Sequence, residues 1–136
     1  MYQIDNYQSV YQSKIPNKQK GSGVGMYIHQ NYNFTEIPQV SCCTYNLEAL
    51  FVTITNTKTP ITVGVVYRPP NGNINSFNDE FEQLLSQLPN KNVYIQGDFN
   101  MNLHNIDNNC SIFERIFISN GYVPLISIAT HRRPQY

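Results

Sequence analysis

The sequence has no excess of charge of either sign, because nine lysines and arginines balance nine aspartates and glutamates among 136 residues. No global basic field therefore argues for nucleic acid as a partner, and any DNA contact must come from a local patch. Scattered basic side chains are often no more than solvated surface. The nearest candidates for a patch are Lys14, Lys18, Lys20, Arg68, Arg132 and Arg133.

The patterns that define several other protein classes are also missing. Three cysteines, Cys42, Cys43 and Cys110, are an odd number without CxxC spacing, so we expect neither a disulfide framework nor a zinc site. The chain shows no signal-peptide pattern and no apolar run near the ~20 residues that span a membrane. These absences favour a soluble intracellular protein.

The composition favours a folded domain. Hydrophobic residues make up 40% of the chain, with ten tyrosines and seven phenylalanines, which are strand formers. At this length we expect one domain, residues 1–136.

An alternation of strands and helices predicts an α/β fold. Two β-branched runs separated by a short polar segment predict an antiparallel hairpin of residues 47–55 and 61–67. Residues 31–44 are expected to form a strand and an irregular connection interrupted by Pro38. Further strands are expected at 6–11, 24–29, from 93 onward and at 122–126.

Two helices are predicted. Ser76, with Asp79 three residues later, resembles a capping box before an apolar stripe that ends at Pro89. A second apolar stripe over residues 111–119 stops at Asn120, before a glycine. Both stripes indicate core packing.

The stretch of residues 93–100 is where chemistry is expected. An apolar run ends at Gly97 and then presents Asp98 and Asn100 two residues apart. The spacing predicts that both polar side chains point into one cleft while Phe99 points to the core. Gly97 would permit a bend or the close approach of a ligand. The same residues are equally compatible with turn chemistry at a strand exit.

Three motifs carry a resemblance to a known family. They are Gly-Asp-Phe-Asn at 97–100, Val-Val-Tyr-Arg-Pro-Pro at 65–70 and Gly-Ser-Gly-Val-Gly-Met-Tyr-Ile at 21–28. In this order and spacing they resemble the endonuclease/exonuclease/phosphatase superfamily, and most of all the endonuclease domain of non-LTR (LINE-type) retrotransposons. The resemblance implies a two-sheet β-sandwich flanked by helices, with an active site at one rim.

The resemblance also implies a reaction, the hydrolysis of DNA phosphodiesters with Mg²⁺ or Mn²⁺. Asp98 would orient the attacking water and contact the metal, Asn100 would hold the scissile phosphate, and Tyr67 would reach it. The implied phosphate or DNA contacts are Arg68, as a bidentate clamp, with Asn71, Thr130 and Arg132. A fusion to a reverse transcriptase and a nuclear location would follow for an active element.

The chain departs from the family pattern at two places. Glu36 and Glu48 follow the glycine-rich strand, so neither occupies the place of the family's main metal ligand, and no Ser-Asp-His segment is present. None of His29, His104 and His131 matches the catalytic histidine. We therefore expect a truncated domain with half a site, inactive alone, marginally stable and prone to self-association.

Two alternatives remain open from the sequence. One is a phosphatase or lipid phosphodiesterase with the same central motif. The other is a gene fragment without enzymatic activity.

Overall fold

The computed structural model describes residues 2–12, 23–101 and 108–126. These described residues form two helices, α1 (Ile74–Ser86) and α2 (Asn108–Ser119), seven strands and one short 3-10 helix, Pro38–Val40. The strands are β1 (Tyr7–Tyr11), β2 (Gly25–His29), β3 (Phe34–Glu36), β4 (Cys42–Cys43), β5 (Glu48–Ile54), β6 (Ile61–Tyr67) and β7 (Val93–Asp98).

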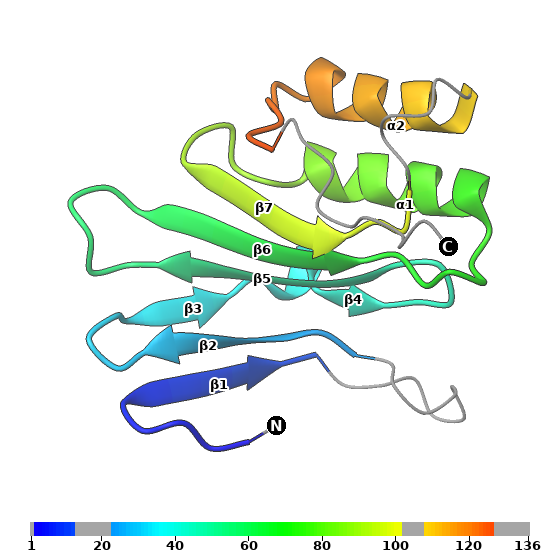
Figure 1. Ribbon diagram of the computed structural model, residues 1–136. Coiled ribbons are helices and arrows are strands. Elements are labelled where there is room, and N and C mark those ends of the chain that lie inside the picture. The colour runs from blue at the N-terminus through cyan, green and yellow to red at the C-terminus, as the bar shows by residue number, and fades with distance from the viewer. Residues whose placement is uncertain (1, 13–22, 102–107, 127–136) are drawn as a thin grey trace.

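The strands form two sheets (Figure 1). In the larger sheet the order is β3-β5-β6-β7, and β4 also pairs with β5. The predicted hairpin is confirmed, since β5 and β6 are antiparallel with Glu48 opposite Tyr67 and Ile54 opposite Ile61. α1 connects β6 to β7, which run parallel. The smaller sheet is the antiparallel pair β1-β2.

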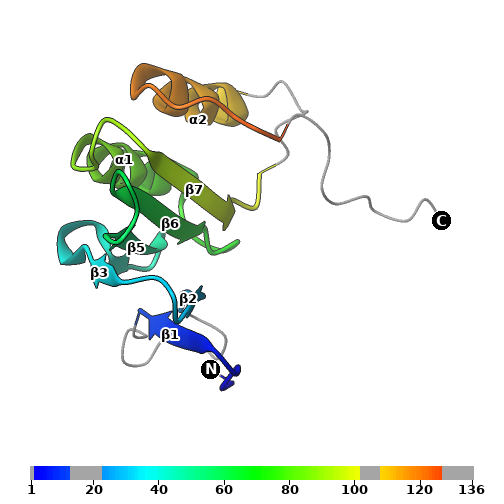
Figure 2. The same cartoon turned by 90° about the vertical axis from the view of Figure 1, so that its left-hand side faces the viewer.

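The layers follow from the alternation of side chains along β5 and β6. On one face, Phe51 and Val66 pack under the aromatic side chains of α1 and α2. On the other face, Leu50 and Val52 pack with residues of the β1-β2 sheet. Figure 2 shows the helices on one side of the large sheet and β1-β2 on the other. The expected two-sheet α/β architecture is thereby confirmed.

The helix starts differ from the predicted ones. α1 begins at Ile74, because Asn73 is the N-cap and its side-chain oxygen accepts a hydrogen bond of 3.0 Å from the Ser76 amide. Ser76 therefore lies inside the first turn rather than capping it. α2 starts at Asn108, before the predicted residue 111.

The irregular connection around Pro38 is confirmed as β3, the 3-10 helix and β4. The strand expected at 122–126 is wrong: this segment is irregular, and Val123 and Leu125 are 78% and 84% exposed. Apolar composition cannot make a strand without a neighbouring strand to pair with. Neither described helix is long and apolar enough to cross a bilayer.

Candidate active site at the strand-end rim

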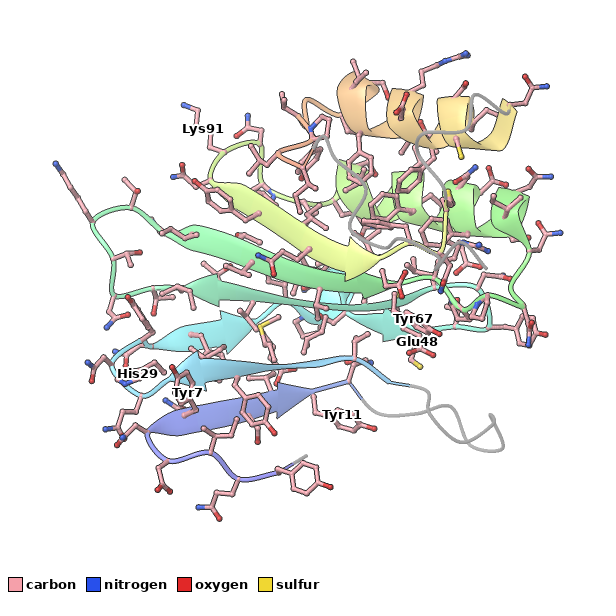
Figure 3. The ribbon with its side chains drawn as sticks, in the orientation of Figure 1. Tyr7, Tyr11, His29, Glu48, Tyr67 and Lys91 are labelled. Atoms are coloured by element: carbon pink, nitrogen blue, oxygen red, sulfur yellow. The ribbon has the colours of Figure 1, made fainter. Side chains whose placement is uncertain are left out.

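The predicted site residues that the structure describes lie at one edge of the large sheet, where β5 begins and β6 and β7 end. We call this edge the rim. Glu48, Tyr67 and Asp98 form a row across the three strands, since Glu48 pairs with Tyr67 and Tyr67 pairs with Asp98. Paired residues share a face of a sheet, so the three side chains project on the side of β1-β2. Figure 3 shows Glu48 and Tyr67 next to each other at this edge.

Asp98 is the last residue of β7 and is exposed. One of its carboxylate oxygens, Oδ1, accepts a hydrogen bond of 3.0 Å from the backbone N–H of Asn100. This side-chain to backbone hydrogen bond closes a turn, as the alternative interpretation of the sequence predicted. The turn does not use up the carboxylate, because an ionised carboxylate offers about four lone-pair sites.

Asn100 lies in the left-handed region, with φ of 48°. Its side-chain nitrogen Nδ2 donates to the backbone oxygen of Arg68 at 2.7 Å. β7 ends at Asp98, and side chains alternate between the two faces of the sheet only as far as this residue. The two-residue spacing that predicted a common face for Asp98 and Asn100 therefore does not apply to Asn100. The turn and this hydrogen bond set its orientation, and the second Nδ2 hydrogen remains for another acceptor.

Arg68 follows β6 directly and is only 8% exposed. Its guanidinium donates to backbone oxygens, from Nε to Phe99 at 2.7 Å and from Nη2 to Asn100 at 2.7 Å, with a longer Nη1 contact of 3.4 Å to Gly72. The backbone N–H of Arg68 donates to the backbone oxygen of Asp98 at 2.9 Å. Arg68 therefore fastens the turn that carries Asp98 to the end of β6.

The turn after Arg68 is closed by a 3.0 Å bond from the Gly72 N–H to the Pro69 oxygen. Asn71 lies exposed in this turn. Tyr67 is half-buried between the flanking members of the row. Thr130 and Arg132 lie outside the described residues, as do Lys14, Lys18, Lys20, His104 and His131.

The residue before the turn must be a glycine because β7 passes very close to β6 at Gly97. A Cβ at this position would overlap the backbone oxygen of Val66 on β6. The close approach is therefore to the neighbouring strand within the fold. It brings the end of β7 against β6 and places Asp98 beside Tyr67.

Glu48 was not among the predicted site residues, yet it belongs to the row. Its side chain is fully buried, and Oε2 accepts a hydrogen bond of 2.6 Å from the backbone N–H of Gly23. This bond joins β5 to the residues just before β2. The predicted hairpin brings the start of its first strand near Tyr67, but only the register in the structure puts Glu48 opposite Tyr67.

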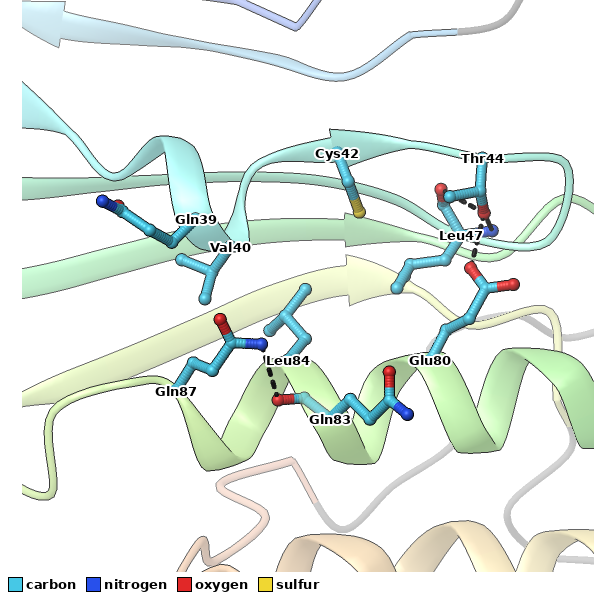
Figure 4. A pocket seen from close by; sticks show the side chains of 9 residues that line it. All are labelled: Gln39, Val40, Cys42, Thr44, Leu47, Glu80, Gln83, Leu84 and Gln87. Atoms are coloured by element: carbon cyan, nitrogen blue, oxygen red, sulfur yellow. Dashed lines mark hydrogen bonds between the residues drawn. The ribbon is translucent and has the colours of Figure 1, made fainter.

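A separate cavity of about 170 Å³ lies beside α1, away from the row (Figure 4). The Glu80 carboxylate there accepts hydrogen bonds from Thr44 Oγ1 at 2.6 Å and from Asn46 Nδ2 at 2.9 Å. Burial, the Glu80 charge and Cys43 raise the pKa of Cys42 to about 11. Cys42 is therefore a protonated thiol at neutral pH, and these contacts fasten α1 to the turn before β5.

Within the described residues no three histidine, cysteine, aspartate or glutamate side chains cluster as metal ligands. His29 lies on β2, with its ring centroid 5.1 Å from that of Tyr7. In Figure 3 this pair is at the opposite end of the molecule from Glu48. Of the row, Asp98 alone is an exposed carboxylate.

Comparisons with known proteins place this geometry in a fold. No protein-family model matches the sequence, and no curated protein matches it. Among solved structures, the chain is similar to the endonuclease domain of TRAS1, a telomere-specific non-LTR retrotransposon, with a TM-score of 0.67 and 15% sequence identity. The chain has the fold of a retrotransposon endonuclease domain. The match covers 87% of this chain and 54% of the TRAS1 chain, so the chain spans about half of that domain.

Proposed function

We propose that this chain is the central part of an endonuclease of retroelement origin, which hydrolyses DNA phosphodiesters when its domain is complete. The observation that carries the proposal is the placement of Asp98 beside Tyr67 at the rim of this fold. An exposed carboxylate next to a phenol offers a water-orienting base and a hydrogen-bond donor for a phosphate oxygen. The domain would act where its DNA is, in the nucleus.

Each residue of the rim has a chemical task in this proposal. Asp98 would hold the attacking water and accept its proton, and the Tyr67 hydroxyl and the unused Nδ2 hydrogen of Asn100 would donate to phosphate oxygens. Arg68 would act mainly by fixing the turn, because its guanidinium already has three backbone acceptors. Asn71, Thr130 and Arg132 stay candidates for contacts to the DNA backbone.

The donor set suits Mg²⁺ or Mn²⁺ only in part. Mg²⁺ in proteins is commonly held by one or two carboxylates together with substrate phosphates, and the described rim offers the Asp98 carboxylate. A bound divalent ion would supply positive charge to a phosphate in reaction. We therefore expect the chain alone to bind Mg²⁺ no better than millimolar and to show no detectable nicking.

The substrate class can be tested with a completed domain, made by joining residues 1–136 to the parts of the TRAS1 domain that the match does not cover. Supercoiled plasmid, an inositol phosphate and sphingomyelin are offered to it with Mg²⁺, and the 136-residue chain is assayed in parallel. We expect nicking of plasmid by the completed domain only. Hydrolysis of the lipid or the inositol phosphate in preference to DNA would overturn the proposed substrate.

A further inference from the structure

The row at the rim contains a carboxylate to which the proposed function gives no task. Glu48 pairs with Tyr67, and Tyr67 pairs with Asp98, so Glu48 lies on the same face of the sheet as both proposed reacting groups. Its side chain has no exposed surface, whereas Asp98 is exposed. A side chain without exposed surface does not touch a substrate, so any effect of Glu48 on the reaction must pass through its neighbours.

One neighbour of Glu48 is the backbone just before β2. Glu48 Oε2 accepts a hydrogen bond of 2.6 Å from the N–H of Gly23, 25 residues earlier in the chain. A hydrogen bond weakens steeply when its angle changes, so it fixes a direction as well as a distance. Apolar packing is not directional. The bond therefore sets how the smaller sheet lies on the large one at the rim.

The backbone at Gly23 requires a glycine. Its φ is 114°, in the left-handed region that side chains disfavour. A Cβ there would lie 2.9 Å from the hydroxyl oxygen of Tyr11 and 3.3 Å from the backbone oxygen of Gln12. In Figure 3, Tyr11 lies at the same end of the molecule as Glu48. Contacts with Tyr11 of β1 and Glu48 of β5 thus fix this glycine of the motif at residues 21–28.

The next residue relays this position to Tyr67. Val24 is 8% exposed and belongs to the apolar cluster between the sheets, and the half-buried Tyr67 packs against the same cluster. Protein interiors are close-packed, so a shift of one group is passed to the groups beside it. A displacement of Gly23 would therefore move Val24 and the surface on which the Tyr67 ring rests.

We propose that Glu48 is a positioning residue of the rim: by holding Gly23, it fixes the apolar surface that orients Tyr67 beside Asp98. Its consequence for catalysis rests on the proposed function, which assigns the phosphate to Tyr67 and the attacking water to Asp98. A misplacement of about 1 Å in such a site can cost about 100-fold in rate. Glu48 thus contributes to the reaction without touching the DNA.

The arrangement is tested first by NMR in the 136-residue chain. Glu48→Met keeps the length of the side chain and removes the acceptor, whereas Glu48→Gln keeps an oxygen that can accept from Gly23. We expect Glu48→Met to move the Gly23 amide proton upfield and to shift the ring signals of Tyr67. Glu48→Gln should leave the ring signals in place. Ile54→Ala, a core change at the opposite end of β5, is the control for a general loss of stability and should also leave them in place.

The consequence for catalysis is measured as kcat and KM for plasmid nicking by the completed domain. We expect Glu48→Met to lower kcat about tenfold or more with KM within about twofold of the wild type, and Glu48→Gln to keep kcat within about threefold. Ile54→Ala should leave kcat unchanged. In a Tyr67→Phe background, Glu48→Met should lower kcat no further, because the hydroxyl that it positions is gone.

Gly23→Ala disturbs the same hydrogen bond from its other partner. The added Cβ meets the Tyr11 hydroxyl, so this variant should shift the same Tyr67 ring signals. It replaces Glu48→Met in both experiments if circular dichroism shows that Glu48→Met does not fold.

Three results would overturn the inference. The first is a folded Glu48→Met protein whose Tyr67 ring signals match the wild type. The second is an equal shift of these signals in Ile54→Ala. The third is a loss of kcat in Glu48→Met that adds in full to the loss in Tyr67→Phe. A wild-type completed domain that does not nick plasmid would instead contradict the proposed function, and the NMR comparison would still decide whether Glu48 positions Tyr67.

Discussion

Replacing Arg68 by methionine should destabilise the protein more than any change of an exposed charge. Methionine keeps much of the side-chain volume and removes the donors to the backbone oxygens of Phe99 and Asn100, both 2.7 Å away. A hydrogen bond from a charged group contributes about 1.5–3 kcal/mol, and the variant no longer has to bury a charge. The two effects together predict a loss of about 3 kcal/mol in the free energy of unfolding.

Urea unfolding measures this loss. The chain has no tryptophan, so the transition is followed by far-ultraviolet circular dichroism. With a slope of about 1.5 kcal/mol per molar urea, the midpoint of Arg68→Met should fall by about 2 M. Arg68→Lys should lie between it and the wild type, because an ammonium lacks the planar fork that reaches both oxygens.

Arg115→Met is the matched control, since Arg115 is exposed on α2 and the same atoms are exchanged. It should change the free energy of unfolding by no more than about 0.5 kcal/mol. If Arg68→Met moved the midpoint no further than Arg115→Met does, the carbonyl contacts would not hold the turn, and the reasoning about Arg68 would be wrong.

Three further predictions concern the framework around the site. Gly97→Ala should lower the free energy of unfolding by about 2 kcal/mol or more, because the added Cβ meets the Val66 backbone oxygen and neither strand can move freely. An unchanged midpoint of urea unfolding would contradict this close approach of β7 to β6. Asn73→Ala should cost about 1 kcal/mol through loss of the α1 cap, whereas Asn75→Ala, exposed in the same turn, should cost little. Cys42 should resist iodoacetamide at pH 8 in the folded protein, because its raised pKa of about 11 keeps the thiol protonated. Because the pKa is raised on folding from 9.0, its contribution to stability should be full below pH 9 and be lost as the pH rises to about 11.

Local patterns predicted the central sheet well. The run from Ile61 to Tyr67 is rich in valine, and a short polar connection joins it to β5, so the hairpin follows from β-propensity and connection length. The turn at Asp98 was also predictable, because aspartate followed two residues later by an amide N–H forms such turns readily.

The remaining features depend on partners that are distant in the sequence. The resemblance implied that Arg68 clamps a phosphate with its guanidinium. Only the tertiary structure shows that this guanidinium donates hydrogen bonds to the backbone oxygens of Phe99 and Asn100. The sequence pattern showed that Glu48 does not occupy the place of the family's main metal ligand. Its position beside Tyr67, however, depends on the register of the hairpin. A single sequence does not contain the contacts that decide such side-chain tasks.

The most direct test of the central claim, that the rim is an active site, is nicking of supercoiled plasmid by the completed domain carrying Asp98→Asn. The amide oxygen of asparagine can still accept the Asn100 N–H, so the turn is kept while the negative charge is lost. Asp79→Asn, on the exposed side of α1, is the control for loss of a carboxylate. We predict that Asp98→Asn lowers the rate about 100-fold or more and that Asp79→Asn leaves it unchanged. A completed domain that nicks plasmid equally well with Asp98→Asn would contradict the account.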